Sequence, residues 1–425
     1  MDEVFVEIES LAPGGDAVGR QRGRVASGAE AGPDGTAEDA NDGRVTFVPL
    51  AAPGERVRAR IVREQGRVAW GELTSVERAG ADRVAPACPL FGACGGCQWQ
   101  HVSIAAQHAA KKVIVERALG IAIPPVIAAS KPVGYRDRAK LAVGGGRVGF
   151  RARRSHEVVD VPACPLFSQR LARALPAVRA LGARLPDGGE IDLQAGLVGD
   201  GDGGETGVCI DVARVDGAGA AHARREWDRL SAGGVVGLSL AGKPAHGRIS
   251  VNVAEAGSPP LPASPSGFAQ VGHEANAILV AAVLDAVGPE PGHVVELYAG
   301  SGNFTRHLFS RAKSLWAYEA DPAAVDRGRA TVPGATWGLG APRLPAERPI
   351  DLVLLDPPRE GGDAPNLTVA QRARSRIVYV SCDPQTLARD ARRIAAGGFR
   401  LTGAVALDLM PHTHHVEVVA VFDRA

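Results

Sequence analysis

The 425-residue sequence lacks several features that would assign it to a whole class of protein. It has no apolar run of the roughly 18–20 residues that a membrane-spanning helix needs, so no membrane partner is expected. Residues 1–4 have neither a basic start nor an apolar stretch, and no secretory signal peptide is predicted. The net charge of +1 excludes a polycation, so any nucleic-acid-binding surface must be local. We expect a cytoplasmic protein.

Lysine and cysteine are both scarce. Only six of the 48 basic residues are lysine, and this arginine bias fits a GC-rich genome better than an arginine-rich binding motif. The sequence has six cysteines, and a reducing cytosol argues against a disulfide framework in a chain of this length. Three of them, Cys88, Cys94 and Cys97, fall within ten residues, which indicates ligation of a metal or a cluster.

The apolar pattern divides the chain into three predicted domains. Short apolar runs separated by Gly and Pro predict an OB-type β-barrel over residues 1–78, with a flexible acidic loop at 26–42. Residues 79–262 predict a central α+β domain that contains the cysteine cluster. From 263 to 425 strands and helices alternate, which is typical of an α/β fold with a parallel, doubly wound sheet.

A glycine-containing turn follows the first strand of the α/β domain. Gly300 and Gly302 would let a ligand approach the backbone at the carboxyl edge of the sheet. Glu319 ends the next strand, where an acid can bind ribose hydroxyls, and Asp356 ends a third. Thr305 stands where the dinucleotide fingerprint has its third glycine, so the pattern favours S-adenosylmethionine over a dinucleotide. An ordinary tight turn is the alternative.

Cys382 is a candidate nucleophile at the end of a further strand. A helix follows it directly, and the positive end of that helix should lower the thiol pKa. Carbon 5 of uracil is too electron-poor to attack a methyl sulfonium unaided, but a thiolate that adds to carbon 6 creates a nucleophilic enolate. A base must then remove the hydrogen on carbon 5. The alternative is a cysteine of the core.

The segment 411–417 offers two kinds of base, because it contains three histidines and Glu417. The residues alone do not choose between histidine and glutamate, and they show no further ligand set for a metal. Asp356 is followed by two prolines and Arg359, whereas enzymes that methylate amino groups have an aromatic residue at that place. Arg359 therefore argues against methylation of an amino group.

The cysteine spacing is informative about the bound group. Zinc sites usually consist of two close pairs, whereas three close cysteines and a distant fourth suit an iron–sulfur cluster. Cys164, which stands two residues after Pro162 and directly before Pro165, is the candidate fourth ligand. Zinc and inert cysteines are the alternatives. Cys209 lies in an alternating apolar strand and is expected in the core.

Together these motifs resemble the RNA uracil-5 methyltransferase family, particularly its members with an N-terminal TRAM domain and a [4Fe–4S] cluster. The resemblance extends over nearly the whole chain and includes Gly-Phe-Arg at 149–151 and Phe-Ala-Gln at 268–270. It implies a Rossmann-like class I methyltransferase fold, S-adenosylmethionine as cofactor, and methylation of carbon 5 of a uridine in RNA. By position, it implies that Cys382 is the nucleophile, Glu417 the base, and the cofactor-binding residues Gln270, Tyr298, Asn303, Glu319 and Asp356.

The resemblance leaves the RNA substrate as the main question. Members with a cluster suggest 23S rRNA, with tRNA as the alternative, and we expect a monomer. A non-catalytic RNA-binding iron–sulfur protein is a further alternative, which the presence of Cys382 and the glycine turn disfavours. This chain has Asp383 where the family usually has asparagine. The candidate RNA-binding arginines are Arg58, Arg60, Arg63, Arg151, Arg153 and Arg154.

Overall fold

The computed structural model describes residues 3–24, 43–129, 131–198, 206–254 and 257–425. The predicted acidic loop at 26–42 lies outside these residues. The chain divides into two compact units. Unit 1 comprises Met1–Ile114 and Pro411–His414, and unit 2 comprises Val115–Met410 and His415–Ala425. Among the described residues, no helix has the length and apolar character needed to span a membrane.

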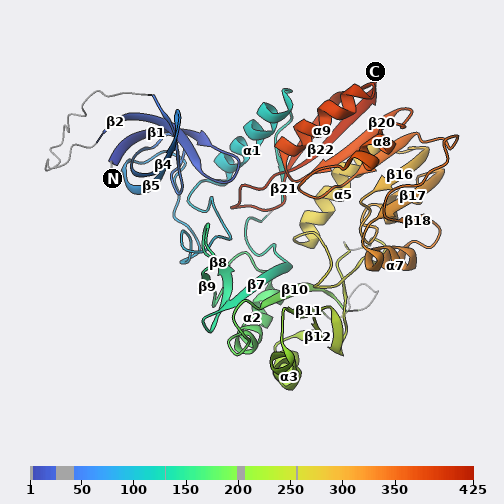
Figure 1. Ribbon diagram of the computed structural model, residues 1–425, viewed down its shortest axis with the longest axis horizontal. Coiled ribbons are helices and arrows are strands. Elements are labelled where there is room, and N and C mark those ends of the chain that lie inside the picture. Colours follow the sequence, from blue (N-terminus) through green and yellow to red (C-terminus); the bar gives the residue numbers. More distant parts are fainter. Residues whose placement is uncertain (1–2, 25–42, 130, 199–205, 255–256) are drawn as a thin grey trace. The chain divides into compact units, whose positions relative to one another are not determined.

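Unit 1 contains a closed β-barrel with the strand order β1-β2-β3-β5-β4 (Figure 1). Its strands are β1 (Glu3–Leu11), β2 (Ala17–Arg24), β3 (Val45–Val48), β4 (Arg56–Gln65) and β5 (Val68–Arg78). Buried and half-exposed side chains alternate along β1, so that Val4, Val6 and Ile8 fill the barrel. Closure removes the free strand edges. The barrel expected from the sequence is thus present and is compatible with a TRAM-like domain.

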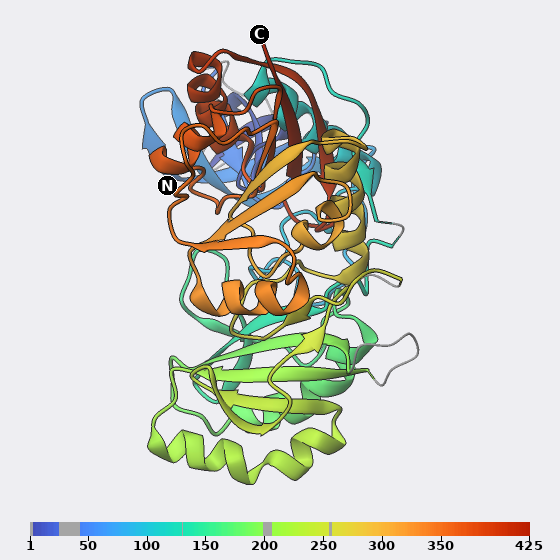
Figure 2. The same ribbon diagram turned by 90° about the vertical axis from the view of Figure 1, so that its right-hand side faces the viewer.

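The central sheet of unit 2 has the strand order β13-β12-β11-β10-β7-β8-β9, with the short β14 paired to β10 and β15 paired to β14. Two helices, α2 (Gln169–Gly182) and α4 (Trp227–Ala232), contribute Leu175 and Leu230 to its core, and α3 (Gly217–Arg225) precedes α4 (Figure 2). The strands are β7 (Arg138–Gly144), β8 (Arg147–Arg151), β9 (Val158–Asp160), β10 (Glu190–Leu197), β11 (Thr206–Ala213), β12 (Val235–Leu240), β13 (Lys243–Gly247), β14 (Val251–Asn252) and β15 (Pro262–Ala263).

A second sheet of unit 2 has the strand order β18-β17-β16-β19-β20-β22-β21-β6. Its first five strands are parallel. The strand β22 then runs antiparallel to both of its neighbours, β20 and β21. The strands are β16 (His293–Leu297), β17 (Ser314–Glu319), β18 (Thr336–Leu339), β19 (Leu352–Leu355), β20 (Arg376–Ser381), β21 (Phe399–Asp408), β22 (Glu417–Arg424) and β6 (Ile127–Ala128). The strands β21 and β22 form a terminal antiparallel hairpin.

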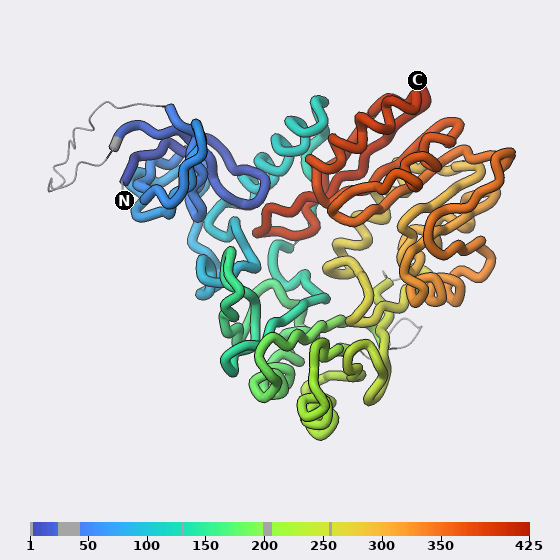
Figure 3. The backbone as a smooth tube through the Cα atoms, viewed as in Figure 1, coloured from blue at the N-terminus to red at the C-terminus, as the bar shows by residue number. Residues whose placement is uncertain are grey.

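Helices cover both faces of this sheet. Neighbouring residues of β19 point to opposite faces, so Leu354 packs in the core with α5 (His273–Val287) and Leu355 in the core with α9 (Pro384–Ala396). The same region contains α6 (Thr305–Leu308), α7 (Pro322–Thr331) and α8 (Ala364–Ala370), and α1 (Ile104–Leu119) adds Val115 to the core that includes Leu355. The strand β6, from far earlier in the chain, pairs with β21 at the end of the same sheet, and Figure 3 traces the backbone between these segments. The predicted doubly wound α/β fold is confirmed.

The position of a ligand site follows from this topology. The chain leaves β16 toward β17 on one side, whereas β19 pairs on the other side of β16. In doubly wound sheets, ligands bind at the carboxyl ends of the strands where the strand order reverses in this way. A ligand site is therefore expected at the carboxyl ends of β16 and β19.

Candidate active site

Several of the residues singled out in the sequence lie at one edge of the sheet. Tyr298 follows β16, Glu319 ends β17, Asp356 follows β19, and Cys382 follows β20. Because these strands are parallel, their carboxyl ends meet at the same edge. The antiparallel β22 pairs Val418 with Ser381, so Glu417 begins that strand at the level of Cys382. Sheet register thus brings the candidate base to the candidate nucleophile.

The turn after β16 has an unusual backbone. Tyr298 has a φ of 61°, and Gly300 and Gly302 have φ of 57° and 95°. A non-glycine residue in this left-handed region costs about 1 kcal/mol or more, and such residues cluster at ligand sites. A Cβ on Gly302 would also lie 3.3 Å from the ring of Trp337. The hydroxyl of Tyr298 accepts a hydrogen bond from the amide of Asp363 at 2.9 Å.

Glu319 fixes the same turn from the neighbouring strand. Its Oε2 accepts from the amide of Gly300 at 2.9 Å, and its Oε1 accepts from the amides of Ala320 and Asp321 at 2.7 and 2.9 Å. Each carboxylate oxygen carries two lone pairs, so the side chain keeps acceptor capacity for hydroxyl groups. Glu319 therefore shapes the turn and remains able to bind a ribose.

A buried carboxyl lies beneath the turn. Glu296, only 1% exposed, accepts from Oγ1 of Thr305 at 2.7 Å, while its Oε1 has no hydrogen-bond partner in the described part of the chain. Burial, together with the charges of Asp356 and Glu319, raises the pKa of Glu296 to about 8, whereas the hydrogen bonds from Thr305 act in the opposite direction. Sequence reasoning missed this residue, although an acid inside an apolar strand is a detectable signal.

Asn303 is held by a residue that sequence reasoning also missed. The side-chain amides of Asn303 and Asn276 exchange two hydrogen bonds, of 2.9 and 2.7 Å. Asn276 is buried in α5. The pair joins the glycine turn to that helix and fixes the orientation of both amides. Nothing in the sequence around Asn276 marks it, because its partner comes from another element.

Gln270 lies half-buried in the loop that leads into α5. The end of this loop is fixed by Asp137 of the central sheet region. The amide of Asp137 donates to the carbonyl of Val271 at 2.7 Å, and its Oδ2 lies 2.8 Å from Nδ1 of His273. The carboxylate of Asp137 raises the pKa of His273 by hydrogen bonding and charge. Within unit 2, this contact connects the central sheet to the start of α5.

The thiol of Cys382 is less acidic than the sequence suggested. Burial raises its pKa to about 11, the charges of Glu417 and Asp356 add to this, and Arg359 acts in the opposite direction. The amides of Gln385 and Thr386 at the start of α9 bond to Oδ1 of Asp383, at 2.9 and 3.1 Å. The lowered pKa predicted from the helix terminus is therefore wrong, because burial and two carboxyls raise the thiol pKa and Asp383 caps that terminus.

The carboxyls near Cys382 also have raised pKa values. Burial, followed by the charge of Glu319, raises the pKa of Asp356 to about 7. Burial, followed by the charge of Asp356, raises the pKa of Glu417 well above its ordinary value. Clusters of carboxyls with raised pKa values are typical of functional sites. A cationic ligand at this edge would favour the ionised forms.

The chain bends tightly around Cys382. Oγ of Ser381 donates to the carbonyl of Asp383 at 3.0 Å and lies 3.2 Å from its amide. Oδ2 of Asp383 also lies 3.6 Å from Nε of Arg359. The aspartate that stands in place of the family's usual asparagine therefore serves as a helix cap and as an ion-pair partner.

The predicted cluster ligands are distributed over both units. Cys88, Cys94 and Cys97 belong to unit 1, and Cys164 belongs to unit 2. All four are half-buried, and none forms a disulfide. Among the described residues, no three His, Cys, Asp or Glu side chains form a group that could hold a metal ion. Cys209 is buried in β11, as expected for a core residue.

Several predicted RNA-binding arginines have partners within the protein. Arg58 forms an ion pair with Glu77 at 3.0 Å, Arg60 pairs with Glu72, and Arg63 lies over the Trp70 ring at 4.6 Å from its centre. In the central sheet, Nη1 of Arg151 lies 2.9 Å from Nδ1 of His156. Phosphate groups would therefore have to compete with these contacts.

Comparison with known proteins shows which family the chain resembles. Residues 347–425 match a family model described as tRNA (Uracil-5-)-methyltransferase. The 23S rRNA (uracil(1939)-C(5))-methyltransferase of Alkalilimnicola ehrlichii is 35% identical over 421 residues, which cover 90% of this chain and 93% of that relative. Its counterpart in Chromohalobacter salexigens is 32% identical over 428 residues, covering 92% of this chain and 86% of that relative.

A solved structure has the same fold over the whole chain. The Pyrococcus abyssi tRNA (uracil-54, C5)-methyltransferase, in complex with S-adenosyl-L-homocysteine, superimposes with a TM-score of 0.73 at 23% identity. The match covers 99% of this chain and 100% of that one. On the strength of the relatives that match nearly full length, the chain belongs to the RNA uracil-C5 methyltransferase family.

Proposed function

We propose that this protein transfers a methyl group from S-adenosylmethionine to carbon 5 of a uridine in 23S rRNA. The observation that carries the proposal is the placement of Cys382 and Glu417 at one level of the sheet edge, beside Asp356. The substrate follows the relatives, which are named for a uracil of 23S rRNA. A tRNA substrate is the alternative, since the matching family model and the P. abyssi enzyme are named for tRNA.

In this proposal, the residues Gln270, Tyr298, Asn303, Glu319 and Asp356 hold S-adenosylmethionine. The remaining acceptor position on Oε2 of Glu319 suits a ribose hydroxyl, and the acidic edge suits a positively charged sulfur. When bound, the cofactor supplies a methyl group on a sulfonium. The charge of Asp356 acts on the thiol of Cys382. Asp356 therefore lies where the methyl donor and the nucleophile must both be present.

The protein's own residues would carry the steps on the uracil. The Cys382 thiolate forms a bond to carbon 6, and the electron pair of the carbon 5–carbon 6 double bond moves to the carbonyl oxygen at carbon 4. Carbon 5 would then form a bond to the methyl carbon of the donor as the bond between that carbon and sulfur breaks, which leaves a neutral thioether. Glu417 removes the remaining hydrogen from carbon 5 as a proton, the double bond re-forms, and the bond between carbon 6 and sulfur breaks. The raised pKa of Glu417 suits a carboxylate that accepts a proton.

We also propose that Cys88, Cys94, Cys97 and Cys164 bind a [4Fe–4S] cluster. The spacing of the four cysteines supports this proposal, as does the fact that all four are half-buried and outside disulfides. The amide of Gly96 lies 3.4 Å from Sγ of Cys94, a contact typical of backbone donors to cluster thiolates. A cluster would supply a covalent crosslink between segments of the chain. Such ligands require a reducing compartment, which favours the cytoplasm.

The proposal keeps the three domains expected from the sequence, 1–78, 79–262 and 263–425, and a monomeric enzyme. The closed barrel and the two separate sheets support that division. The base remains the least constrained assignment, since His414 and His415 lie close to Glu417 in sequence. Glu417 is favoured because its charge acts on Cys382.

The function is tested by incubating the protein with methyl-labelled S-adenosylmethionine and either 23S rRNA or tRNA that lacks 5-methyluridine. We expect label in 5-methyluridine of 23S rRNA, and none with Cys382→Ala. Label in tRNA alone would replace the substrate, and binding of RNA without any label would favour the non-catalytic alternative. Binding affinity should fall steeply with salt, because phosphate contacts release counterions.

A further inference from the structure

A short segment follows the Asp356-Pro357-Pro358 corner and connects the two halves of the active site. This strap, residues 359–363, begins at Arg359, which lies 3.6 Å from Asp383 beside Cys382. It ends at Asp363, whose amide donates to the hydroxyl of Tyr298 at 2.9 Å. The strap thus contacts the nucleophile's loop at one end and the glycine turn at the other.

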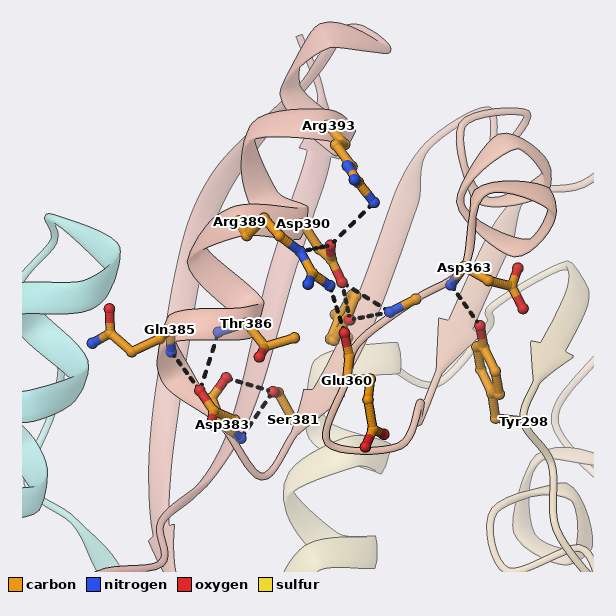
Figure 4. A network of polar contacts seen from close by, with 12 residues as sticks. Tyr298, Glu360, Asp363, Ser381, Asp383, Gln385, Thr386, Arg389, Asp390 and Arg393 are labelled. Atoms are coloured by element: carbon orange, nitrogen blue, oxygen red, sulfur yellow. Dashed lines mark hydrogen bonds and ion pairs between the residues drawn. The ribbon is translucent and has the colours of Figure 1, made fainter. Parts of the chain in front are cut away.

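The middle of the strap is fastened to α9 by one buried side chain. Asp390 is 0% exposed, and its Oδ2 accepts from the amide of Gly362 at 2.8 Å and from the hydroxyl of Tyr379 at 2.7 Å. The same amide of Gly362 lies 3.1 Å from that hydroxyl. Arg389 contributes a second fastening, from Nη2 to the carbonyl of Glu360 at 2.6 Å (Figure 4).

The other oxygen of Asp390 faces arginines of its own helix. Oδ1 accepts from Nε of Arg389 at 3.0 Å and lies 3.7 Å from Nη1 of Arg393. The carboxylate is therefore surrounded by donors on both oxygens. A carboxylate can accept from all of these donors, because both of its oxygens are acceptors. An asparagine would instead point its amino group toward the donors on one side.

The strap is also in close contact with α9. Gly361 has a φ of 91°, and a Cβ there would overlap Arg389, Asp390 and Thr386. Glycine is therefore required twice at this position, by its backbone conformation and by the close approach of the helix. The strap is therefore held close to α9, and its contacts with Asp390 and Tyr379 fix its position there.

From this arrangement, we propose that Asp390 is a positioning residue, which, together with Tyr379, clamps the strap and thereby holds Arg359 beside Cys382. The inference rests on the proposed function, because it takes Cys382 as the nucleophile. The charged and titratable groups that face the thiol are Glu417, Asp356 and Arg359, and Arg359 is the cation among them. Those that face Asp390 are Tyr379, Arg389 and Arg393. Release of the strap should therefore remove a positive charge from the thiol without touching either carboxyl.

The test is the rate at which iodoacetamide alkylates Cys382 in the purified full-length protein, followed peptide by peptide between pH 7 and 11. Arg359→Met removes the cation directly, and Asp390→Asn releases the strap. Both should slow alkylation at pH 8 by roughly 3- to 10-fold, the effect of one partly screened charge. The double variant should be no slower than Arg359→Met, because the two changes act through the same charge.

Three controls separate positioning from general damage. Gly361→Ala displaces the strap while it leaves Asp390 intact, and it should reproduce the slower alkylation. Tyr379→Phe removes one of the two donors to Oδ2 and should have a smaller effect in the same direction. Asp423 on β22 forms an ion pair with Arg376 of β20 at 2.8 Å. Asp423→Asn breaks this pair and should leave the alkylation rate unchanged.

The outcomes distinguish this proposal from the function itself. If Asp390→Asn lowers the melting temperature but leaves alkylation as in the wild type, Asp390 is only structural and the proposal is overturned. Effects of Arg359→Met and Asp390→Asn that multiply in the double variant would overturn it as well. If Asp390→Asn does not fold, Gly361→Ala and Tyr379→Phe decide. Methyl transfer by Cys382→Ala would instead refute the proposed function and leave the alkylation result standing.

Discussion

The reactivity of Cys382 in the free enzyme gives the sharpest test of the site. Its thiol is half-buried and faces Glu417 and Asp356, with Arg359 as the opposing charge, and its pKa is about 11. At pH 8, three units lower, only about 0.1% of the thiol would be ionised. Because only the thiolate reacts, alkylation at pH 8 should proceed at about one thousandth of the limiting rate reached at high pH.

Glu417→Gln is the matching perturbation. It removes the charge that contributes most, after burial, to the raised pKa of Cys382. Alkylation at pH 8 should therefore accelerate, by roughly 3- to 10-fold for one charge in a partly exposed site. The direction is opposite to that expected for Arg359→Met, so the two variants test the sign of the electrostatics as well as its size.

The assay measures iodoacetamide labelling of the peptide that contains Cys382, so the other five cysteines do not interfere. A wild-type midpoint at or below about 8.5, the ordinary thiol value, would refute the reasoning. It would mean that the start of α9 outweighs burial and the two carboxyls, as the sequence alone had suggested. Slower alkylation in Glu417→Gln would contradict the assigned role of that charge.

Three further predictions concern the chemistry, the cluster and the cofactor. Glu417→Gln should accumulate a covalent, methyl-labelled enzyme–RNA adduct that survives denaturing electrophoresis, and normal turnover would exclude Glu417 as the base. Cys164→Ser should lose iron and the broad absorbance near roughly 400 nm, whereas Cys209→Ser should keep both, and stoichiometric zinc in the wild type would contradict the cluster. The pKa of Asp356 is about 7, so its carboxyl ionises as the pH rises through that value. Calorimetry should therefore show that affinity for cationic S-adenosylmethionine, relative to neutral S-adenosylhomocysteine, rises from pH 6 to pH 8, and a constant ratio would argue against Asp356 in the pocket.

The sequence was informative wherever function depends on the ends of elements. Tyr298, Glu319, Asp356 and Cys382 could be placed at one edge because each follows a strand in an alternating α/β pattern, and parallel strands present their ends together. The glycine turn was detectable for a similar reason, since Gly302 is needed locally for its backbone conformation. These features depend on short stretches of sequence and on one rule of topology.

Features that depend on pairs of distant residues could not be predicted. The bond between Asn303 and Asn276, and that between Asp390 and Gly362, join different elements and leave no local pattern. The prediction of a lowered pKa for Cys382 failed for the same reason. A helix terminus can be recognised beside the cysteine, whereas Glu417 approaches it only through the register of β22 against β20.

The carboxyls at the edge of the sheet destabilise the folded protein, and the fold itself does not require them. Buried carboxyls are ordinarily stabilised by cations or by several donors, because burial of an unpaired charge is unfavourable. Asp390 follows that rule, with arginines and a hydroxyl around it. Glu296 and Asp356 instead lie near other carboxyls: the charge of Asp356 raises the pKa of Glu296, and the charge of Glu319 raises the pKa of Asp356. Replacing them with apolar residues would relieve this repulsion without breaking a strand, so selection for stability does not explain them. A positively charged ligand at the same edge does, since it would convert the repulsion into affinity.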